Sequence, residues 1–204
     1  MPATAFNELS FDPDALREKY REERDKRIRS DGNDQYTGVT GDFSRYVDDP
    51  YVDPGFARSA VECTVEVLII GGGFGGMLAA ARLRDQGIND LMIVEKGGGC
   101  GGTWYWNRYP CAYCDIESLV YLPLLEETGF IPKQKYTNAS ETLEYCQVIA
   151  DQYQLHDIAL MQTQILATDW DEAEGLWTAR TNRDDVIKAR YVIHSNGPLN
   201  RPKL

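Results

Sequence analysis

The sequence predicts an α/β fold, in which a parallel sheet with a small antiparallel meander follows an N-terminal helical extension. Three segments predict the parallel part: a β-branched apolar run at residues 65–70 that stops at glycine, good helix formers at 77–83, and a second apolar run at 91–94. They have the order and the length, about 30 residues, of a strand–helix–strand unit. With 204 residues and 43% hydrophobic content, the chain can bury a substantial core.

The first part of the chain is expected to lie outside this core. Residues 12–29 predict a surface helix, because Asp12 can cap its N-terminus and Pro13 suits its first turn. Charges of both signs along it are typical of a solvated face with ion pairs between neighbouring turns; a partner-binding helix is the alternative. The residues that follow are poor in aliphatic side chains, which indicates an irregular connector. We therefore expect an extension at residues 1–60 and a domain at 61–204.

The last third of the chain predicts one helix and three strands. Ser140 is expected to cap a helix at residues 141–153, and Glu144 would complete a capping box. The first two strands are expected to form the small meander, and the third a buried strand that returns to the parallel sheet. The three strands are predicted at residues 161–170, 176–181 and 189–194.

Composition excludes several classes of partner. The net charge of −11 argues against binding to nucleic acid or to an anionic membrane, and favours a small-molecule or protein partner. The first residues lack the basic and apolar regions of a secretory signal, and the longest apolar passage is too short to cross a membrane. Five cysteines, an odd number, fit a reducing compartment, so we expect a cytoplasmic protein.

A glycine motif lies between the first predicted strand and its helix. Gly71, Gly73 and Gly76 satisfy the pattern G-x-G-x-x-G, in which the glycines allow a tight turn, close approach of a pyrophosphate and close helix–strand packing. Glu95 ends the second strand, 19 residues after Gly76, where a carboxylate can accept hydrogen bonds from ribose hydroxyls. The arrangement predicts a Rossmann-like dinucleotide-binding unit. An acid there disfavours a 2′-phosphate, so the dinucleotide should be FAD or NAD rather than NADP.

A second glycine-rich turn favours FAD. It follows Glu95 directly, at residues 97–102, and an aromatic cluster comes straight after it. Such a turn supplies backbone amides for a ribityl chain, and the aromatic side chains supply flat surfaces for an isoalloxazine ring. Simple NAD dehydrogenases do not need it. The sequence therefore predicts a Rossmann-like FAD-binding domain.

At these residues the sequence resembles the Baeyer–Villiger monooxygenases, flavin enzymes related to the flavin-containing monooxygenases. The resemblance spans about residues 65–204. It rests on the first glycine motif, on Glu95 and on the segments Gly-Gly-Thr-Trp-Tyr-Trp-Asn-Arg-Tyr-Pro (101–110), Cys-Asp-Ile-Glu-Ser (114–118) and Ile-His-Ser-Asn-Gly-Pro-Leu-Asn-Arg-Pro (193–202). The charged extension is similar, more loosely, to that of members that take bulky or polycyclic ketones.

The resemblance implies a reaction. In that family NADPH reduces FAD, oxygen adds to the flavin, and the resulting peroxyflavin attacks a ketone so that an ester or a lactone forms. A small-molecule ketone is the implied substrate, with terpenoid and polyketide intermediates as candidates.

The resemblance also implies roles for individual residues. The pyrophosphate is held by Gly71, Gly73, Phe74 and Gly76, and the adenosine ribose by Glu95. The flavin is lined by Gly102, Thr103, Trp104, Tyr105 and Trp106, with Asp115, Ile116 and Tyr121 on its other side. The nicotinamide cofactor is bordered by Tyr113, Cys114 and Asp115. Asp115 is the catalytic candidate, because the family's aspartate positions an arginine that stabilises the peroxyflavin. Core packing is the alternative for the aromatic residues.

Two departures from the family pattern stand out. Cys111 occupies a position where the family usually has glycine, on a turn that is expected to need a positive φ, so we expect the loop to be displaced. The sequence also stops before the family's second dinucleotide-binding domain, before its F-x-G-x-x-x-H-x-x-x-W fingerprint and before the arginine partner of Asp115. The NADPH site is therefore expected to be mostly missing, and the chain not to be active alone. His156 and His194 are interpreted as structural.

Two other functions remain open from the sequence. One is a non-catalytic FAD-binding remnant, or a module completed by a partner chain. The other is a dithiol flavoprotein that uses Cys111 and Cys114, which form a C-x-x-C pair. Flavin disulfide reductases, however, place a cysteine directly after the Gly-Gly-Thr, where this chain has Trp104. A zinc site is disfavoured because no second ligand pair has suitable spacing, so no metal is expected.

Overall fold

The computed structural model describes residues 10–199 and residue 203, in two compact units. The first unit comprises residues 1–44 with residues 202–204, and the second comprises residues 45–201.

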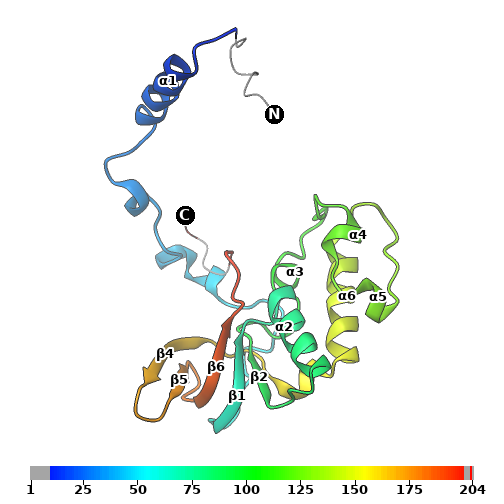
Figure 1. The fold of residues 1–204 in the computed structure, drawn as a ribbon. Helices are drawn as coiled ribbons and strands as arrows, with labels where there is room; N and C mark the ends of the chain where they lie inside the picture. The colour runs from blue at the N-terminus through cyan, green and yellow to red at the C-terminus, as the bar shows by residue number, and fades with distance from the viewer. Residues whose placement is uncertain (1–9, 200–202, 204) are drawn as a thin grey trace, which may run out of the picture. The chain divides into compact units, whose positions relative to one another are not determined.

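In the first unit, α1 (Pro13–Asp25) confirms the predicted helix, although it ends at Asp25 rather than at residue 29 (Figure 1). The Asp12 side chain accepts a hydrogen bond from the backbone N–H of Asp14 at 2.9 Å. No residue of α1 is buried, and its ion pairs, such as Arg17 with Asp14, are exposed. Exposed pairs contribute less than about 1 kcal/mol each, so these pairs add little to the stability of α1. Two short 3-10 helices follow, η1 (Gly32–Gln35) and η2 (Gly41–Val47), and the last three residues of η2 belong to the second unit.

A six-stranded sheet forms the centre of the second unit (Figure 1). Its strands are β1 (Glu62–Ile70), β2 (Leu91–Val94), β3 (Ala159–Leu160), β4 (Ile165–Asp171), β5 (Leu176–Thr181) and β6 (Val186–His194), in the order β3-β2-β1-β6-β5-β4. β1 is parallel to β2 and β6, and β3 is parallel to β2, whereas β4, β5 and β6 pair antiparallel. The predicted parallel sheet with a meander is confirmed. β6 belongs both to the parallel part, next to β1, and to the antiparallel part, next to β5.

Helices lie over one face of this sheet. Successive strand residues face opposite sides. Ile69 belongs to the apolar cluster that contains Met77 of α2 and Tyr145 of α6, whereas Leu68 belongs to a second cluster with Ile187. Among the described residues, no helix combines the length and the apolar run that crossing a membrane requires. The helices of this unit are α2 (Phe74–Asp85), α3 (Thr103–Trp106), α4 (Ser118–Tyr121), α5 (Leu125–Thr128) and α6 (Ala139–Gln152), with a 3-10 helix η3 (Leu155–Ile158).

The parallel strands end at one edge of the sheet. The register pairs Ile70 at the end of β1 with Val94 of β2 and with His194 of β6. Gly71 and Glu95, which directly follow β1 and β2, therefore emerge next to each other. In open α/β sheets ligands bind at this carboxyl edge, so the topology places the glycine motif and its acid together.

The predicted start of α6 was wrong. Asn138, not Ser140, is the capping residue, and its side-chain oxygen accepts a hydrogen bond from the backbone N–H of Glu141 at 2.9 Å. Ser140 and Glu144 lie inside the helix. The Glu141 side chain stands at the capping-box position, yet it accepts from the backbone N–H of Lys133 at 2.9 Å instead. A tertiary contact with the preceding loop therefore replaces the local capping bond.

Two strand predictions also need correction. β4 begins at Ile165 rather than at residue 161, because the backbone N–H groups of Gln162 and Thr163 donate to the carbonyl oxygens of Gly97 and Glu95, each at 2.9 Å, instead of to β5. β6 is not buried along its whole length: Ala189 is fully buried, but Tyr191 is 52% exposed. The physical reason is that β5 pairs with β6 only as far as Ala189, whereas β1 pairs with it to His194.

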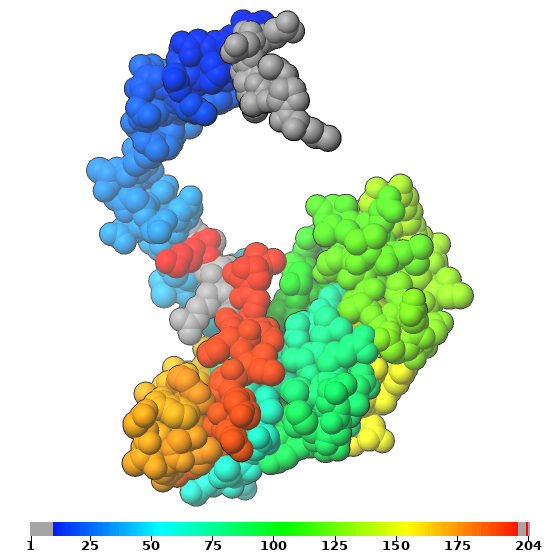
Figure 2. Space-filling view, in the orientation of Figure 1, coloured from blue at the N-terminus to red at the C-terminus, as the bar shows by residue number. Residues whose placement is uncertain are grey.

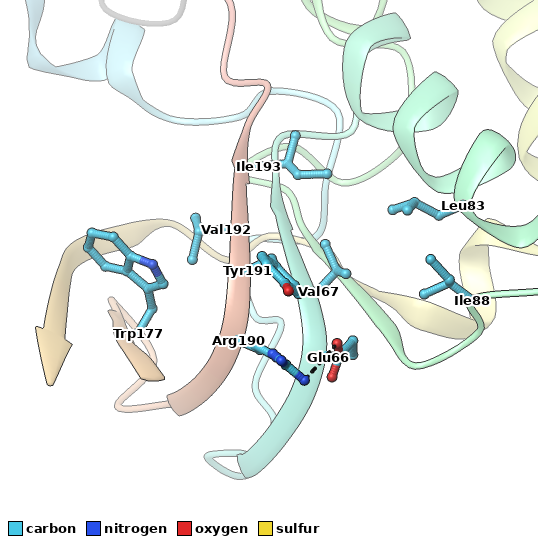
Figure 3. A pocket seen from close by; sticks show the side chains of 9 residues that line it. All are labelled: Glu66, Val67, Leu83, Ile88, Trp177, Arg190, Tyr191, Val192 and Ile193. Atoms are coloured by element: carbon cyan, nitrogen blue, oxygen red, sulfur yellow. Dashed lines mark ion pairs between the residues drawn. The ribbon is translucent and has the colours of Figure 1, made fainter. Parts of the chain in front are cut away.

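A groove of about 480 Å³ lies beside this exposed part of β6 (Figure 3). Its wall is mostly apolar, and an ion pair between Arg190 and Glu66, 3.8 Å apart, stands at its rim. None of its lining residues belongs to the predicted site. The orange-red part of the chain, which includes the end of β6, reaches the molecular surface in Figure 2. The lining residues are Glu66, Val67, Leu83, Ile88, Trp177, Arg190, Tyr191, Val192 and Ile193.

A buried ion pair attaches the connector to the sheet. Both oxygens of Asp185, which is 1% exposed, accept hydrogen bonds from the Arg58 guanidinium at 2.6 Å. The carboxylate also accepts from the Val61 backbone N–H at 2.7 Å and the Thr181 hydroxyl at 2.6 Å. The Arg58 bond, then the Thr181 and Val61 bonds, outweigh burial and lower the pKa of Asp185 to about 2. The network fixes residues 58–61 to the β5–β6 turn.

Replacing Asp185 by asparagine is expected to lower the free energy of unfolding at pH 7 by about 3 kcal/mol, because the Arg58 charge would lose its buried partner. The wild-type carboxylate stabilises the fold fully above its unfolded pKa of about 4, and this contribution is lost as the pH falls through about 2. The difference between wild type and Asp185→Asn should therefore shrink over that range. Urea unfolding at pH 7 and at pH 3 measures both effects.

The control for this experiment is Asp169→Asn, which removes the exposed partner of Arg180. It should change the free energy of unfolding by less than about 0.5 kcal/mol. Equal losses of unfolding free energy in the two variants would contradict the stabilising role assigned to the buried Asp185 carboxylate.

Candidate functional site

The first glycine turn is closely packed backbone. Gly71 has a φ of +106°, and a Cβ built on it would lie 2.5 Å from the carbonyl oxygen of Ser195. A Cβ on Gly76 would lie 1.9 Å from the carbonyl oxygen of Gly71. No side chain larger than hydrogen fits either position without movement of backbone. The turn thus has the geometry that the glycine motif predicts.

Helix α2 starts directly from this turn. Gly73 is its N-terminal capping residue and contributes no side-chain hydrogen bond, and Phe74 is the first helical residue. Backbone N–H groups at a helix N-terminus carry a partial positive charge and attract phosphate groups. The N-terminus of α2, which lies at the carboxyl end of β1, is therefore suited to bind a pyrophosphate.

Glu95 is held between two glycine backbones. The side chain is 7% exposed; one carboxylate oxygen accepts from Gly72 N–H and the other from Gly97 N–H, each at 2.6 Å. A carboxylate has about four lone-pair sites, so capacity remains for two ribose hydroxyls. The two bonds fix the orientation of the carboxylate before any ligand arrives.

The second glycine turn packs against the first. Gly101 N–H donates to the carbonyl oxygen of Gly72 at 2.9 Å. Gly102 has a φ of +53°, and a Cβ on it would lie 2.7 Å from the Cα of Gly73. The two turns are far apart in sequence, yet their backbones touch, because neither carries side chains at the contact.

Three of the predicted aromatic residues form one cluster. The rings of Phe74 and Trp104 each meet the ring of Tyr121 edge-on, with centroids 5.7 and 5.8 Å away. The Trp104 indole N–H donates to the Tyr121 hydroxyl at 2.8 Å. Burial is the main cause that raises the pKa of Tyr121, so its phenol stays protonated at neutral pH. The cluster joins the start of α2 to α3 and α4.

The other predicted site residues have more varied surroundings. Trp106 is half-buried, with the Lys96 ammonium 5.6 Å from its ring centroid, and Thr103 is exposed. Tyr113, Asp115 and Ile116 are exposed. Cys114 is buried, and its backbone N–H donates to Thr137 at 2.9 Å, which anchors residues 113–116 beside α6.

Sequence reasoning missed the residues that contact the second glycine turn from the connector. Asp49 accepts hydrogen bonds from Gly98 N–H at 3.0 Å and from the Tyr105 hydroxyl at 2.8 Å. Nothing in the sequence around Asp49 indicates this contact, because aspartates are frequent throughout residues 30–60. The only signal is in the turn itself, where three consecutive glycines allow another segment to approach closely.

The cysteines do not pair. All five are free; Cys111 is exposed and Cys114 is buried. Burial raises the pKa of Cys100 to about 12, and it also raises the pKa of Cys146. Cys111 has a φ of +65°, so the expected positive φ at this turn is confirmed. Among the described residues, no group of three or more His, Cys, Asp or Glu side chains could hold a metal ion.

Comparison with known proteins agrees with this geometry. Residues 69–124 match the family described as an NAD(P)-binding Rossmann-like domain. The chain is 48% identical over 194 residues to neopentalenolactone D synthase of Streptomyces avermitilis, covering 95% of this chain and 32% of that protein. It is 46% identical over 189 residues to a Baeyer–Villiger monooxygenase of Streptomyces coelicolor, covering 93% and 31%. Over nearly its whole length the chain is therefore similar to Baeyer–Villiger monooxygenases.

A solved structure extends the likeness to the fold. The polycyclic ketone monooxygenase of the thermophilic fungus Thermothelomyces thermophila superimposes with a TM-score of 0.83 at 36% identity, over 94% of this chain and 33% of that one. The chain therefore spans about a third of the length of these relatives.

Replacing Gly76 by alanine is expected to lower the free energy of unfolding by at least about 2 kcal/mol, because the new Cβ overlaps the Gly71 carbonyl. Gly75→Ala is the matched control. A Cβ there meets only the Ser195 side chain at an ordinary 3.6 Å, and alanine is the better helix former, so this variant should gain up to about 1 kcal/mol. Thermal and urea unfolding measure both; similar effects of the two substitutions would contradict the packing described.

Replacing Cys111 by glycine is expected to raise the free energy of unfolding by up to about 1 kcal/mol, because glycine adopts the positive φ without a Cβ penalty. Ala112→Gly, at the next, buried position, should instead lower it by about 1 kcal/mol. Urea unfolding of both variants makes the comparison. A loss of stability in Cys111→Gly equal to that of the control would show that the left-handed residue is not strained.

Proposed function

We propose that this chain is the FAD-binding portion of a Baeyer–Villiger monooxygenase, with residues 61–204 as the flavin domain and residues 1–60 as an extension. The observation that carries the proposal is the Glu95 carboxylate, fixed by Gly72 and Gly97 between two glycine turns at the carboxyl edge of the sheet. Bound there, FAD supplies the redox chemistry by which NADPH and oxygen convert a ketone to an ester or lactone.

The dinucleotide is held from its adenosine end. The pyrophosphate binds at the start of α2, over Gly71, Gly73, Phe74 and Gly76, where helix amides offset its charge. Glu95 accepts hydrogen bonds from the two ribose hydroxyls. Because the chain has a net charge of −11, attraction of an anionic cofactor depends on this local field of backbone amides and not on the charge of the whole protein.

The aromatic cluster serves the flavin end. Phe74, Trp104 and Tyr121 exclude water from the side of the turn next to α4 and offer flat apolar surfaces to an isoalloxazine ring. The Tyr121 hydroxyl accepts from Trp104 and stays protonated, so its own hydrogen is available to an acceptor on a ligand. Gly102, Thr103, Tyr105 and Trp106 support the same side through α3.

The exposed segment at residues 113–116 is the proposed catalytic part of this chain. Asp115 has an exposed carboxylate, and the hydrogen bond from Cys114 N–H to Thr137 anchors the backbone next to it. A carboxylate on an anchored backbone is suited to position a cationic group. Tyr113, Cys114 and Ile116 are the residues that would border NADPH and flavin. A ketone is the proposed substrate; a polycyclic one fits the name of the solved relative. The free cysteines support a cytoplasmic location.

The visible absorption spectrum of the purified chain, titrated with FAD, tests the proposal. Wild type should show a shifted flavin band, and Glu95→Gln should bind FAD about 10- to 100-fold more weakly, because its amide nitrogen would face a backbone N–H and leave a buried donor unpaired. Glu144→Gln, at an exposed position on α6, is the control and should bind like wild type. Equal FAD affinity in wild type and Glu95→Gln would contradict the site, and no flavin binding by wild type would contradict the function.

Addition of NADPH to the flavin complex without oxygen extends this test. A band that stays unbleached would place hydride delivery on residues outside this chain, and bleaching would place it within the chain. Size-exclusion chromatography of the same sample shows whether a second polypeptide copurifies, as a complementing chain would.

A further inference from the structure

Residues 49–52, here called the strap, cross the second glycine turn at residues 97–102, here called the cofactor turn. Both lie in the second compact unit. Three hydrogen bonds connect them, one directly and two through the Tyr105 hydroxyl. The Tyr105 hydroxyl donates to an Asp49 carboxylate oxygen at 2.8 Å, and Gly98 N–H donates to the same oxygen at 3.0 Å and to the Tyr105 hydroxyl at 2.9 Å. Asp49, Tyr105 and Gly98 therefore form a closed triangle of hydrogen bonds.

Close packing accompanies these bonds. A Cβ on Gly98 would lie 2.2 Å from a methyl carbon of Val52, so the strap occupies the space that a side chain would need. The Tyr105 ring lies under the rest of the turn: a Cβ on Gly97 would be 2.9 Å from it, and one on Gly99 would be 3.4 Å from it. Tyr105 is 5% exposed. The turn is enclosed between the strap and the ring.

An arginine closes the arrangement on its other side. The Arg108 guanidinium lies 3.9 Å from the ring centroid of Tyr51 and 4.3 Å from that of Tyr105, and its Nε donates to the Tyr105 carbonyl at 2.8 Å. The Tyr51 backbone N–H donates to the second oxygen of Asp49 at 2.9 Å. Both carboxylate oxygens of Asp49 are thus engaged, one within the strap and one on the turn.

The cofactor turn is also the support of Glu95. Gly97, the residue before the hydrogen-bonded triangle, donates its N–H to the Glu95 carboxylate at 2.6 Å, and its carbonyl accepts from Gln162 at 2.9 Å. Displacement of Gly98 would move Gly97, and with it the bond that orients the carboxylate. The strap is therefore connected to the Glu95 carboxylate through two consecutive residues, Gly98 and Gly97.

We propose that Asp49 and Tyr105 are positioning residues of the dinucleotide site, which hold the cofactor turn so that Glu95 is oriented for the ribose. The role rests on the proposed function, because it concerns the same site. In this role, the connector contributes to cofactor binding through Asp49. Tyr105 positions the cofactor turn, a role that its place in the aromatic segment does not indicate.

The ionisation state of Tyr105 suits this role. Burial first, and then the bond to Asp49, raise the pKa of Tyr105 to about 12. The phenol is therefore protonated at neutral pH and remains a donor to the Asp49 carboxylate. A hydrogen bond to a charged acceptor is among the stronger bonds in proteins.

The test compares FAD binding by the full chain and its variants, measured by absorption titration. Asp49→Ala and Tyr105→Phe should each weaken FAD binding at least about tenfold, because a bond to a charged group is lost. Asp48→Ala removes the neighbouring exposed carboxylate and should bind like wild type. The double variant Asp49→Ala/Tyr105→Phe should bind FAD at most about twofold more weakly than whichever single variant binds it less tightly. The reason is that both substitutions disrupt the same group of hydrogen bonds. Affinity of Asp49→Ala equal to that of Asp48→Ala would overturn the proposal.

Asp49→Asn keeps the role falsifiable if Asp49→Ala does not fold. It retains one acceptor oxygen for Gly98 and should bind FAD more tightly than Asp49→Ala and less tightly than wild type. In that case Tyr105→Phe, whose ring still fills the space under the turn, carries the main comparison. Wild-type affinity in Tyr105→Phe would then overturn the proposal.

Amide hydrogen exchange of the cofactor-free chain separates this proposal from the proposed function. Asp49→Ala should speed exchange at Gly97 and Gly98 at least about tenfold and leave the amides of α6 unchanged, whereas Asp48→Ala should change neither. If exchange changes in this way but wild type does not bind FAD, the proposed function is rejected, whereas the contact between the strap and the cofactor turn is supported. Unchanged exchange at Gly97 and Gly98 would reject the strap itself.

Discussion

The site depends on one buried carboxylate. Glu95 is almost fully enclosed, and its two oxygens accept backbone N–H groups from Gly72 and Gly97, which belong to two different turns. A buried carboxylate is costly unless it is hydrogen-bonded, and the same bonds that offset this cost also tie the two turns together. Stability and ligand geometry are therefore set by the same contacts.

Glycine makes this arrangement possible because two backbones must approach more closely than side chains allow. Gly73 and Gly102 touch across the turns, and Gly71 and Gly76 touch within the first. Each position gives up the packing that a side chain would provide. The loss is offset elsewhere, by the apolar core over α2 and α6.

The two ends of the proposed cofactor site are built differently. The adenosine end has buried groups whose hydrogen bonds are already made, through Glu95, the start of α2 and the strap. The segment at residues 113–116 presents exposed side chains, including Asp115, on an anchored backbone. Pre-organised groups bind at low entropic cost, so the adenosine end is suited to hold the dinucleotide. The exposed groups are suited to contacts that form when other parts of an enzyme or a substrate are present.

The sequence by itself determined the strand–turn–helix unit and the position of Glu95, because both follow from local rules. The positive φ at Cys111 was expected instead from the glycine that similar proteins have at this position. Apolar runs, glycine spacing and Cβ sterics need no knowledge of distant residues. Only the tertiary structure decided that the Glu141 side chain bonds to the Lys133 backbone instead of closing a capping box at Asn138. The exposure of Tyr191 was decided in the same way, because it depends on where β5 stops. The tertiary structure also decided the contacts of Asp49 with Gly98 and Tyr105. These contacts join residues that are 49 and 56 positions apart in sequence, and an aspartate in an irregular connector gives no sign of its partners until the chain is folded.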